Sequence, residues 1–89
     1  MATTNVLVTG TWTKVVLSTE SFLLTALTNA ADTVEVAVFS LADATVHGHK
    51  LNALNGEGLT RDLIGPGDVY VRSLGGTSVA AALTTWVPT

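Results

Sequence analysis

The sequence predicts an all-β fold, a small antiparallel β-sandwich of about seven or eight strands with jelly-roll-like or Greek-key connections. Thr and Val together make up about three in ten residues, and both are β-branched, which penalises helix and suits a pleated sheet. Apolar segments of about five to eight residues alternate with Gly, Pro, Asn and Asp turn signals. We therefore expect one domain over 1–89, with a short N-terminal arm and a C-terminal tail.

The first half of the chain begins with residues 6–8, a short edge strand or an arm. A strand over 11–17 follows, with alternate side chains on opposite faces. Residues 21–28 are apolar on both faces, so a strand there is central in the core or lies at a subunit interface; a short helix is the alternative, because Leu and Ala suit either state. Residues 33–41 alternate Val with other side chains and give the clearest strand in the sequence.

In the second half, strands are expected over 45–51, 59–64, 68–73 and 77–83, with a loop over 52–58. Gly65, Pro66 and Gly67 mark a sharp turn, because proline fixes φ and each glycine can adopt positive φ. Gly75 and Gly76 connect the last two strands as a hairpin. Residues 84–89 extend past the last strand. Both ends of the chain, 2–6 and 85–89, are expected to be flexible until a partner orders them.

The composition favours assembly with other chains. Hydrophobic residues account for 47% of the sequence and charged residues for only 12%, about half the usual charged share of about 25%. A chain of this length buries only about 60–65% of its unfolded surface, and no cysteine is present to form a disulfide. An exposed apolar patch at a protein–protein interface is therefore expected, and with it a homo-oligomer.

The charge pattern argues against nucleic acid or a membrane as the partner. The formal net charge is −3 and the few basic residues are scattered, whereas both partners call for clustered Lys and Arg. The chain starts at Met1 without the basic and apolar regions of a signal peptide, and its apolar runs are much shorter than the ~20 residues of a membrane span. We expect a complete small protein that is made in the cytoplasm and is soluble there.

No catalytic apparatus is recognisable, so we expect neither an enzyme nor a cofactor. The only imidazoles, His47 and His49, flank Gly48, and no nucleophile-elbow sequence surrounds any Ser. On a strand the two histidines would share one face and offer two ligands to a transition metal, which would still need a third. A solvated turn is the favoured interpretation, and no metal is expected. The aspartates fall at turns, where their side chains bond the backbone.

Trp12 and Trp86 are candidate binding residues, because aromatic rings combine a large apolar area with a polar handle. Either ring suits a carbohydrate-stacking surface or an interface between subunits, and for Trp12 a place in the core is the favoured alternative. Trp86 lies next to Val87 and Pro88 in an apolar group that is costly to leave in water. The interface residues we expect are Trp86, Val87, Pro88, Trp12 and Phe22.

Two segments give the chain a resemblance to a known group of proteins. Thr11-Trp12-Thr13-Lys14-Val15 lies near the start, and Gly-Pro-Gly-Asp-Val-Tyr-Val-Arg-Ser spans 65–73. With the Val-rich middle, this pattern resembles the small β-sandwich virion proteins of tailed bacteriophages, such as capsid decoration (cement) and head-fibre proteins. The resemblance covers most of the chain as a pattern and includes no diagnostic motif.

The resemblance implies a non-enzymatic protein on the capsid surface of the virion, made in the host cytoplasm. Such a protein binds the major capsid protein, often as a trimer at threefold positions, and stabilises the lattice. One alternative is a carbohydrate-binding or adhesive module that stacks sugars on Trp12, Tyr70 or Trp86. Another is a structural protein of the tail or neck. Because a fold does not fix a function, the sequence leaves these alternatives open.

Overall fold

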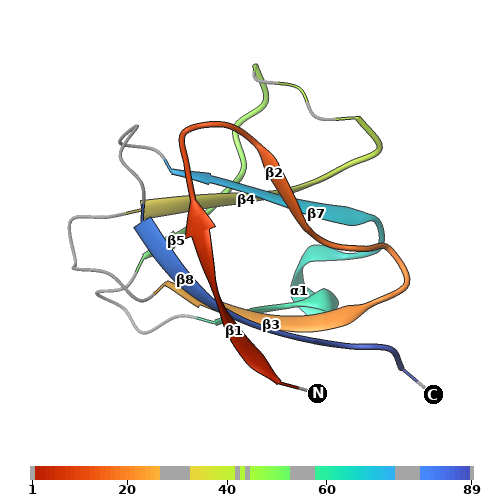
Figure 1. The fold of residues 1–89 in the computed structure, drawn as a ribbon. Helices are drawn as coiled ribbons and strands as arrows, with labels where there is room; N and C mark the ends of the chain where they lie inside the picture. The colour runs from red at the N-terminus through yellow and green to blue at the C-terminus, as the bar shows by residue number, and fades with distance from the viewer. Residues whose placement is uncertain are drawn as a thin grey trace.

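The computed structural model describes residues 2–26, 33–41, 43, 45–52, 58–73 and 79–88. They form two four-stranded sheets (Figure 1) in which every neighbouring pair of strands is antiparallel. Sheet A contains β1 (Thr3–Val8), β8 (Val79–Trp86), β3 (Ser21–Ala26) and β6 (Gly58–Thr60), in that order. Sheet B contains β2 (Thr13–Val16), β7 (Asp68–Ser73), β4 (Thr33–Phe39) and β5 (His49–Asn52). The expected all-β sandwich is confirmed.

The strand orders define a jelly roll. β1 pairs with β8, β2 with β7, β3 with β6 and β4 with β5, so the chain folds as a long hairpin that is wrapped over onto two sheets. β3 and β8 complete sheet A, and β4 and β7 complete sheet B. This is the arrangement of double-sheet jelly rolls, one of the two topologies that the sequence left open.

The core lies between the sheets and follows from strand alternation. In β7 the inward residues Val69 and Val71 are fully buried, and in β4 so are Val34 and Val36. The cluster contains Val8, Val16, Phe22, Leu24, Val34, Val36, Leu51, Val69, Val71, Ala81 and Leu83. Burial of this apolar area is the main source of stability, at about 25 cal/mol per Å² removed from water.

In two segments the structure departs furthest from the expected strand, each for an identifiable reason. The strand expected over 59–64 ends at Thr60, and Arg61–Ile64 forms the short helix α1, which stops at Gly65 with φ 87°. The strand expected over 45–51 begins only at His49. In the preceding segment, the Asp43 carboxylate accepts hydrogen bonds from the Thr45 amide and hydroxyl, which favours a turn over a strand.

The expected flexible ends are regular strands. Residues 3–8 pair with β8 along their whole length, and Thr85 and Trp86 pair with Phe22 and Ser21 of β3. Within the described part of the chain, only Val87 and Pro88 follow the last strand. Both ends are ordered because each completes a ladder of backbone hydrogen bonds.

The last two strands do not form the expected hairpin. β7 belongs to sheet B and β8 to sheet A, so the two strands do not pair with each other. Gly75 and Gly76, the residues expected to connect them as a hairpin, lie outside the described residues. Most of the loop expected over 52–58 also falls outside them.

Gly67 provides a test of the turn before β7. Its φ is 122°, and a Cβ there would overlap Cγ1 of Val38, whereas Gly65, with φ 87°, has nothing within 4 Å of such a Cβ. We expect Gly67→Ala to lower the free energy of unfolding by about 3 kcal/mol and Gly65→Ala by about 1 kcal/mol. Urea unfolding followed by tryptophan fluorescence measures both. Equal losses would mean that contact with Val38 does not constrain the turn.

Candidate functional site

The outer face of sheet A carries no ionisable side chain. Within their described bounds, β1, β3, β6 and β8 contain no Asp, Glu, Lys, Arg or His. All charged strand residues lie in sheet B: Lys14, Glu35, Lys50, Asp68 and Arg72. Strand alternation and register define the outward residues of sheet A, here called the neutral face: Thr3, Asn5, Leu7, Ser21, Leu23, Thr25, Gly58, Thr60, Ala80, Ala82, Thr84 and Trp86.

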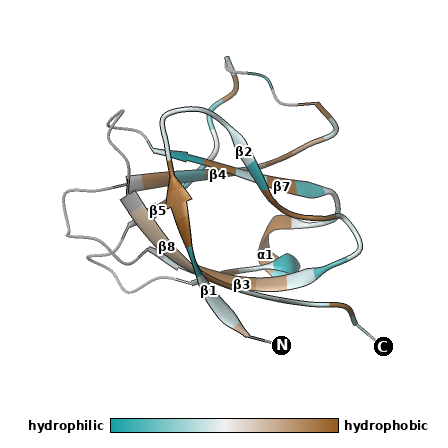
Figure 2. Cartoon of the chain, viewed as in Figure 1, coloured by the Kyte–Doolittle hydropathy of each residue, from teal (hydrophilic) through white to brown (hydrophobic). Residues whose placement is uncertain are grey.

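Large apolar side chains stand on this neutral face. Leu7 is 66% exposed, Leu23 44% and Trp86 36%. The side chains between them are small, such as Ala80 and Ala82 of β8, so the leucines and the tryptophan rise above a low surface. Figure 2 shows the contrast, with strongly hydrophilic segments on β2, β4 and β7 and white to brown along β3 and β8. A face of this kind loses no charge hydration when a partner covers it.

An open groove of about 630 Å³ lies where β8 ends, next to the neutral face. Trp86, Pro88 and Pro66 form its apolar lining. The polar lining comes from Ser18, Thr19, Glu20, Ser21, Arg61 and Asp62. Because Ser21 pairs with Trp86 across β3 and β8, the groove and the neutral face form one continuous surface.

Arg61 holds the groove in shape. Its guanidinium donates to the carbonyl oxygens of Leu17, Glu20, Gly65 and Gly67 at 2.6 to 3.0 Å, through Nε, Nη1 and Nη2. Five bonds engage every N–H donor of a guanidinium. The group also lies 5.3 Å from the centre of the Phe22 ring. Arg61 is therefore a structural clamp between two turns, and the groove presents the hydroxyl and carboxylate groups of its lining together with Trp86.

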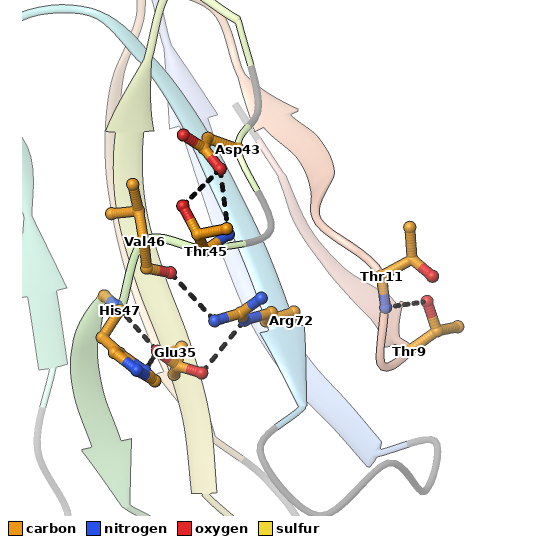
Figure 3. A network of polar contacts seen from close by, with 9 residues as sticks. Thr9, Thr11, Glu35, Asp43, Thr45, Val46, His47 and Arg72 are labelled. Atoms are coloured by element: carbon orange, nitrogen blue, oxygen red, sulfur yellow. Dashed lines mark hydrogen bonds and ion pairs between the residues drawn. The ribbon is translucent and has the colours of Figure 1, made fainter.

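The outer face of sheet B is built differently, around a buried ion pair (Figure 3). Glu35 of β4 is 1% exposed, and its Oε1 accepts from Nε of Arg72 on β7 at 3.0 Å. The Gly48 amide donates to the other oxygen, Oε2, at 2.7 Å, and Arg72 Nη2 donates to the Val46 carbonyl at 2.9 Å. These bonds hold the segment before β5 over the sheet.

Aromatic packing completes this cover. The Arg72 guanidinium lies 4.3 Å from the centre of the Trp12 ring, and Trp12 meets Phe39 edge-on at 5.1 Å. Tyr70 also packs edge-on against Phe39, with 5.5 Å between the two ring centres. Gly48 fits because it has no side chain: a Cβ there would lie 2.9 Å from the Trp12 ring. Trp12 is only 9% exposed, so it offers no open stacking surface.

The network lowers the pKa of Glu35. Burial by itself raises that pKa, because it disfavours the charged carboxylate. The hydrogen bond from the Gly48 amide and the bond and charge of Arg72 outweigh burial, and the pKa lies below its ordinary value of 4.5. Glu35 is therefore ionised at neutral pH, and its negative charge is paired with Arg72 within the fold.

The two histidines do not share a strand face as a metal site would need. His47 precedes β5, 84% of its side chain is exposed, and Nδ1 lies 3.8 Å from Oε2 of Glu35. His49 is the first residue of β5 and pairs with Val36. In the described ranges, no group of three or more His, Cys, Asp or Glu residues is placed to hold a metal ion.

Comparisons with known proteins find no relative of this chain. No protein-family model matches the chain, and no curated protein or solved structure is detectably similar to it. Among the described residues, no helix is long and apolar enough to cross a membrane.

The expected interface residues fall into two groups. Phe22 is fully buried beneath Arg61, and Trp12 is packed under the cover of sheet B, in line with the core alternative favoured for Trp12, so neither presents an open surface to a partner. Trp86 and Pro88 line the groove, and Val87 between them is 67% exposed.

Sequence reasoning missed Leu7, Leu23 and Arg61. The sequence shows that the strands containing Leu7 and Leu23 carry no charge. Whether the two leucines share a face depends on which strands pair. Nothing local to Arg61 marks its carbonyl partners, because Leu17 and Glu20 are about forty residues away in the sequence.

We expect Glu35→Gln to lower the free energy of unfolding by about 3 kcal/mol at neutral pH, because it removes one charge of a buried pair. The contribution of the carboxylate is complete above pH 4.5 and is lost as the pH falls through the lower folded-state pKa. Stability of the native protein should therefore fall more steeply below this pH than that of the variant. Urea unfolding over a pH series measures the difference, and parallel curves would contradict the assignment.

Proposed function

We propose that the protein is a non-enzymatic structural component that binds other proteins through the neutral face and the adjoining groove. In its specific form the proposal is a phage capsid decoration protein that covers contacts of the major capsid protein lattice. The observation that carries it is that Leu7, Leu23 and Trp86 are exposed on one sheet face without charge. Exposed apolar surface rimmed by polar residues is typical of a protein interface.

The size of the neutral face favours a partner that offers repeated sites. Four strands spaced about 4.8 Å apart and about six residues long cover roughly 400 Å², about half of the roughly 800 Å² that one partner contributes to a stable interface. One such contact is weak. A lattice joins many weak contacts, or supplies a composite site from neighbouring subunits, and so turns them into firm binding.

The jelly-roll fold agrees with this proposal without requiring it. Double-sheet jelly rolls occur in viral capsid proteins and in lectins, and the pattern of residues 11–15 and 65–73 resembles small virion proteins of tailed phages. Both points are analogies at the level of the fold. The specific proposal therefore depends on a binding experiment.

Carbohydrate binding is the second candidate, favoured by the groove. Trp86 offers an aromatic wall, while Ser18, Ser21, Glu20 and Asp62 offer hydroxyl and carboxylate groups that suit a polyhydroxylated ligand. Trp12 does not contribute, because the cover of sheet B buries it. This candidate uses the groove without the leucines of the neutral face.

The test is co-sedimentation with capsid shells assembled from the major capsid protein of the phage that carries the gene. The proposal expects saturable binding to assembled shells and none to unassembled subunits, because the site is composite. Binding to a glycan array without binding to shells would favour the carbohydrate candidate. An absence of binding to shells would reject the decoration role.

We expect Trp86→Ala to weaken shell binding by about 2 kcal/mol, because it removes a large apolar contact. Leu23→Lys should weaken it similarly by placing a charge on the neutral face. Leu41→Lys is the matched control, since Leu41 is 83% exposed but lies after β4 of sheet B. Glycan binding, if present, should be lost in Trp86→Ala and retained in Leu23→Lys. Circular dichroism checks that each variant keeps its β structure.

A further inference from the structure

The four edge strands of the two sheets differ in their protection against pairing. β6 has three residues, and β5 has four and carries the exposed Lys50. β2 has four residues, carries Lys14 and has a register irregularity between Lys14 and Val16. Short strands, lysines and bulges are the usual means by which a sheet edge avoids adding a foreign strand. β1 has none of these.

β1 is instead suited to accept a strand. Its six residues Thr3–Val8 contain no charge and no proline, and they pair with β8 in unbroken register from Thr3↔Thr84 to Val8↔Val79. The other side of β1 is an edge of sheet A, visible in red in Figure 1. Along that side, alternate backbone N–H and C=O groups are left for a further partner.

We propose that β1 pairs antiparallel with β1 of a second copy of this chain, so that two copies of sheet A form one continuous eight-stranded sheet. The occupant must be uncharged, extended and about six residues long, and β1 itself meets these requirements. The other edges are shorter or charged, so a ring that joins β1 to a different edge is disfavoured. The pairing therefore has twofold symmetry, in place of the trimer that the resemblance implies.

The register follows from the faces of the strand. The neutral faces of both copies lie on the same side of the joined sheet only if the twofold axis passes beside one residue of β1, so that this residue lies opposite itself in the second copy. With the axis at Asn5, the Asn5 side-chain amide, which both donates and accepts hydrogen bonds, lies opposite Asn5 of the second copy. Leu7 then lies opposite Thr3 of the second copy, and both are uncharged. The neutral face doubles to roughly 800 Å², the area that one side of a stable interface needs.

The oligomeric state is the first test. Sedimentation equilibrium at tens of micromolar should give a mass of about 18 kDa, twice the 9.2 kDa of the chain. A monomer or a trimer under these conditions would overturn the proposal. The measurement needs no capsid, so it can fail independently of the decoration role.

The position of the interface is tested by single cysteines in a chain that has none of its own. Opposed residues in antiparallel strands have Cα atoms about 4.5–5.5 Å apart, within disulfide range. Asn5→Cys should therefore form a disulfide-linked dimer rapidly under mild oxidation. Lys50→Cys, on the edge strand β5 of sheet B, is the matched control and should remain largely monomeric on denaturing gels. Equal cross-linking of both variants would overturn the pairing through β1.

Charge at the crossing point provides the last test. Asn5→Lys places two lysines opposite each other and should raise the dimer dissociation constant about fivefold or more. Asn5→Thr, a neutral β-branched replacement, should leave it within about twofold. If Asn5→Lys keeps a native circular dichroism spectrum and dimerises like the original chain, the proposal is wrong.

Discussion

A sandwich of eight short strands has two outer faces, and the described residues of this chain cover only one of them. Sheet B is covered by the segment before β5, by Trp12, and by the Glu35–Arg72 ion pair that holds the segment down. Sheet A has only uncharged side chains on its outer face, and the large ones among them, Leu7, Leu23 and Trp86, are exposed. This division explains why a sequence with 12% charged residues keeps all its charged strand positions in one sheet. It also leaves sheet A as the surface on which partners are expected.

Two arginines use their donors for opposite purposes. Arg72 neutralises a buried carboxylate, which fixes a loop over sheet B and lowers the pKa of Glu35. Arg61 donates its hydrogen bonds to carbonyl oxygens, and it ties the turn after β2 to α1 and to the turn before β7. Both guanidinium groups are engaged within the fold and are therefore not available to a partner.

The two proposals use adjacent parts of the same sheet for different tasks. Pairing through the edge of β1 joins two copies and leaves the outer faces of both free. The joined surface is large enough for a firm contact with a partner, whereas a single neutral face is not. The groove at Trp86 lies where β8, the strand paired with β1, ends. Self-association would thus prepare the surface that binds a lattice, although each step can be measured without the other.

The sequence by itself determined the all-β class, the turn at Gly65-Pro66-Gly67 and most strand positions, because alternation and turn residues act over a few neighbours. It also marked Trp86, Val87 and Pro88 as exposed apolar residues. Only the tertiary structure decided that Phe22 and Trp12 are enclosed, that residues 61–64 turn into a helix, and that Leu7 and Leu23 share a face. Each of these depends on contacts between residues far apart in the sequence, such as Arg61 with Leu17 or β1 with β8. Local propensity does not specify which strands pair, so the neutral face cannot be identified without the order of the strands in the sheet.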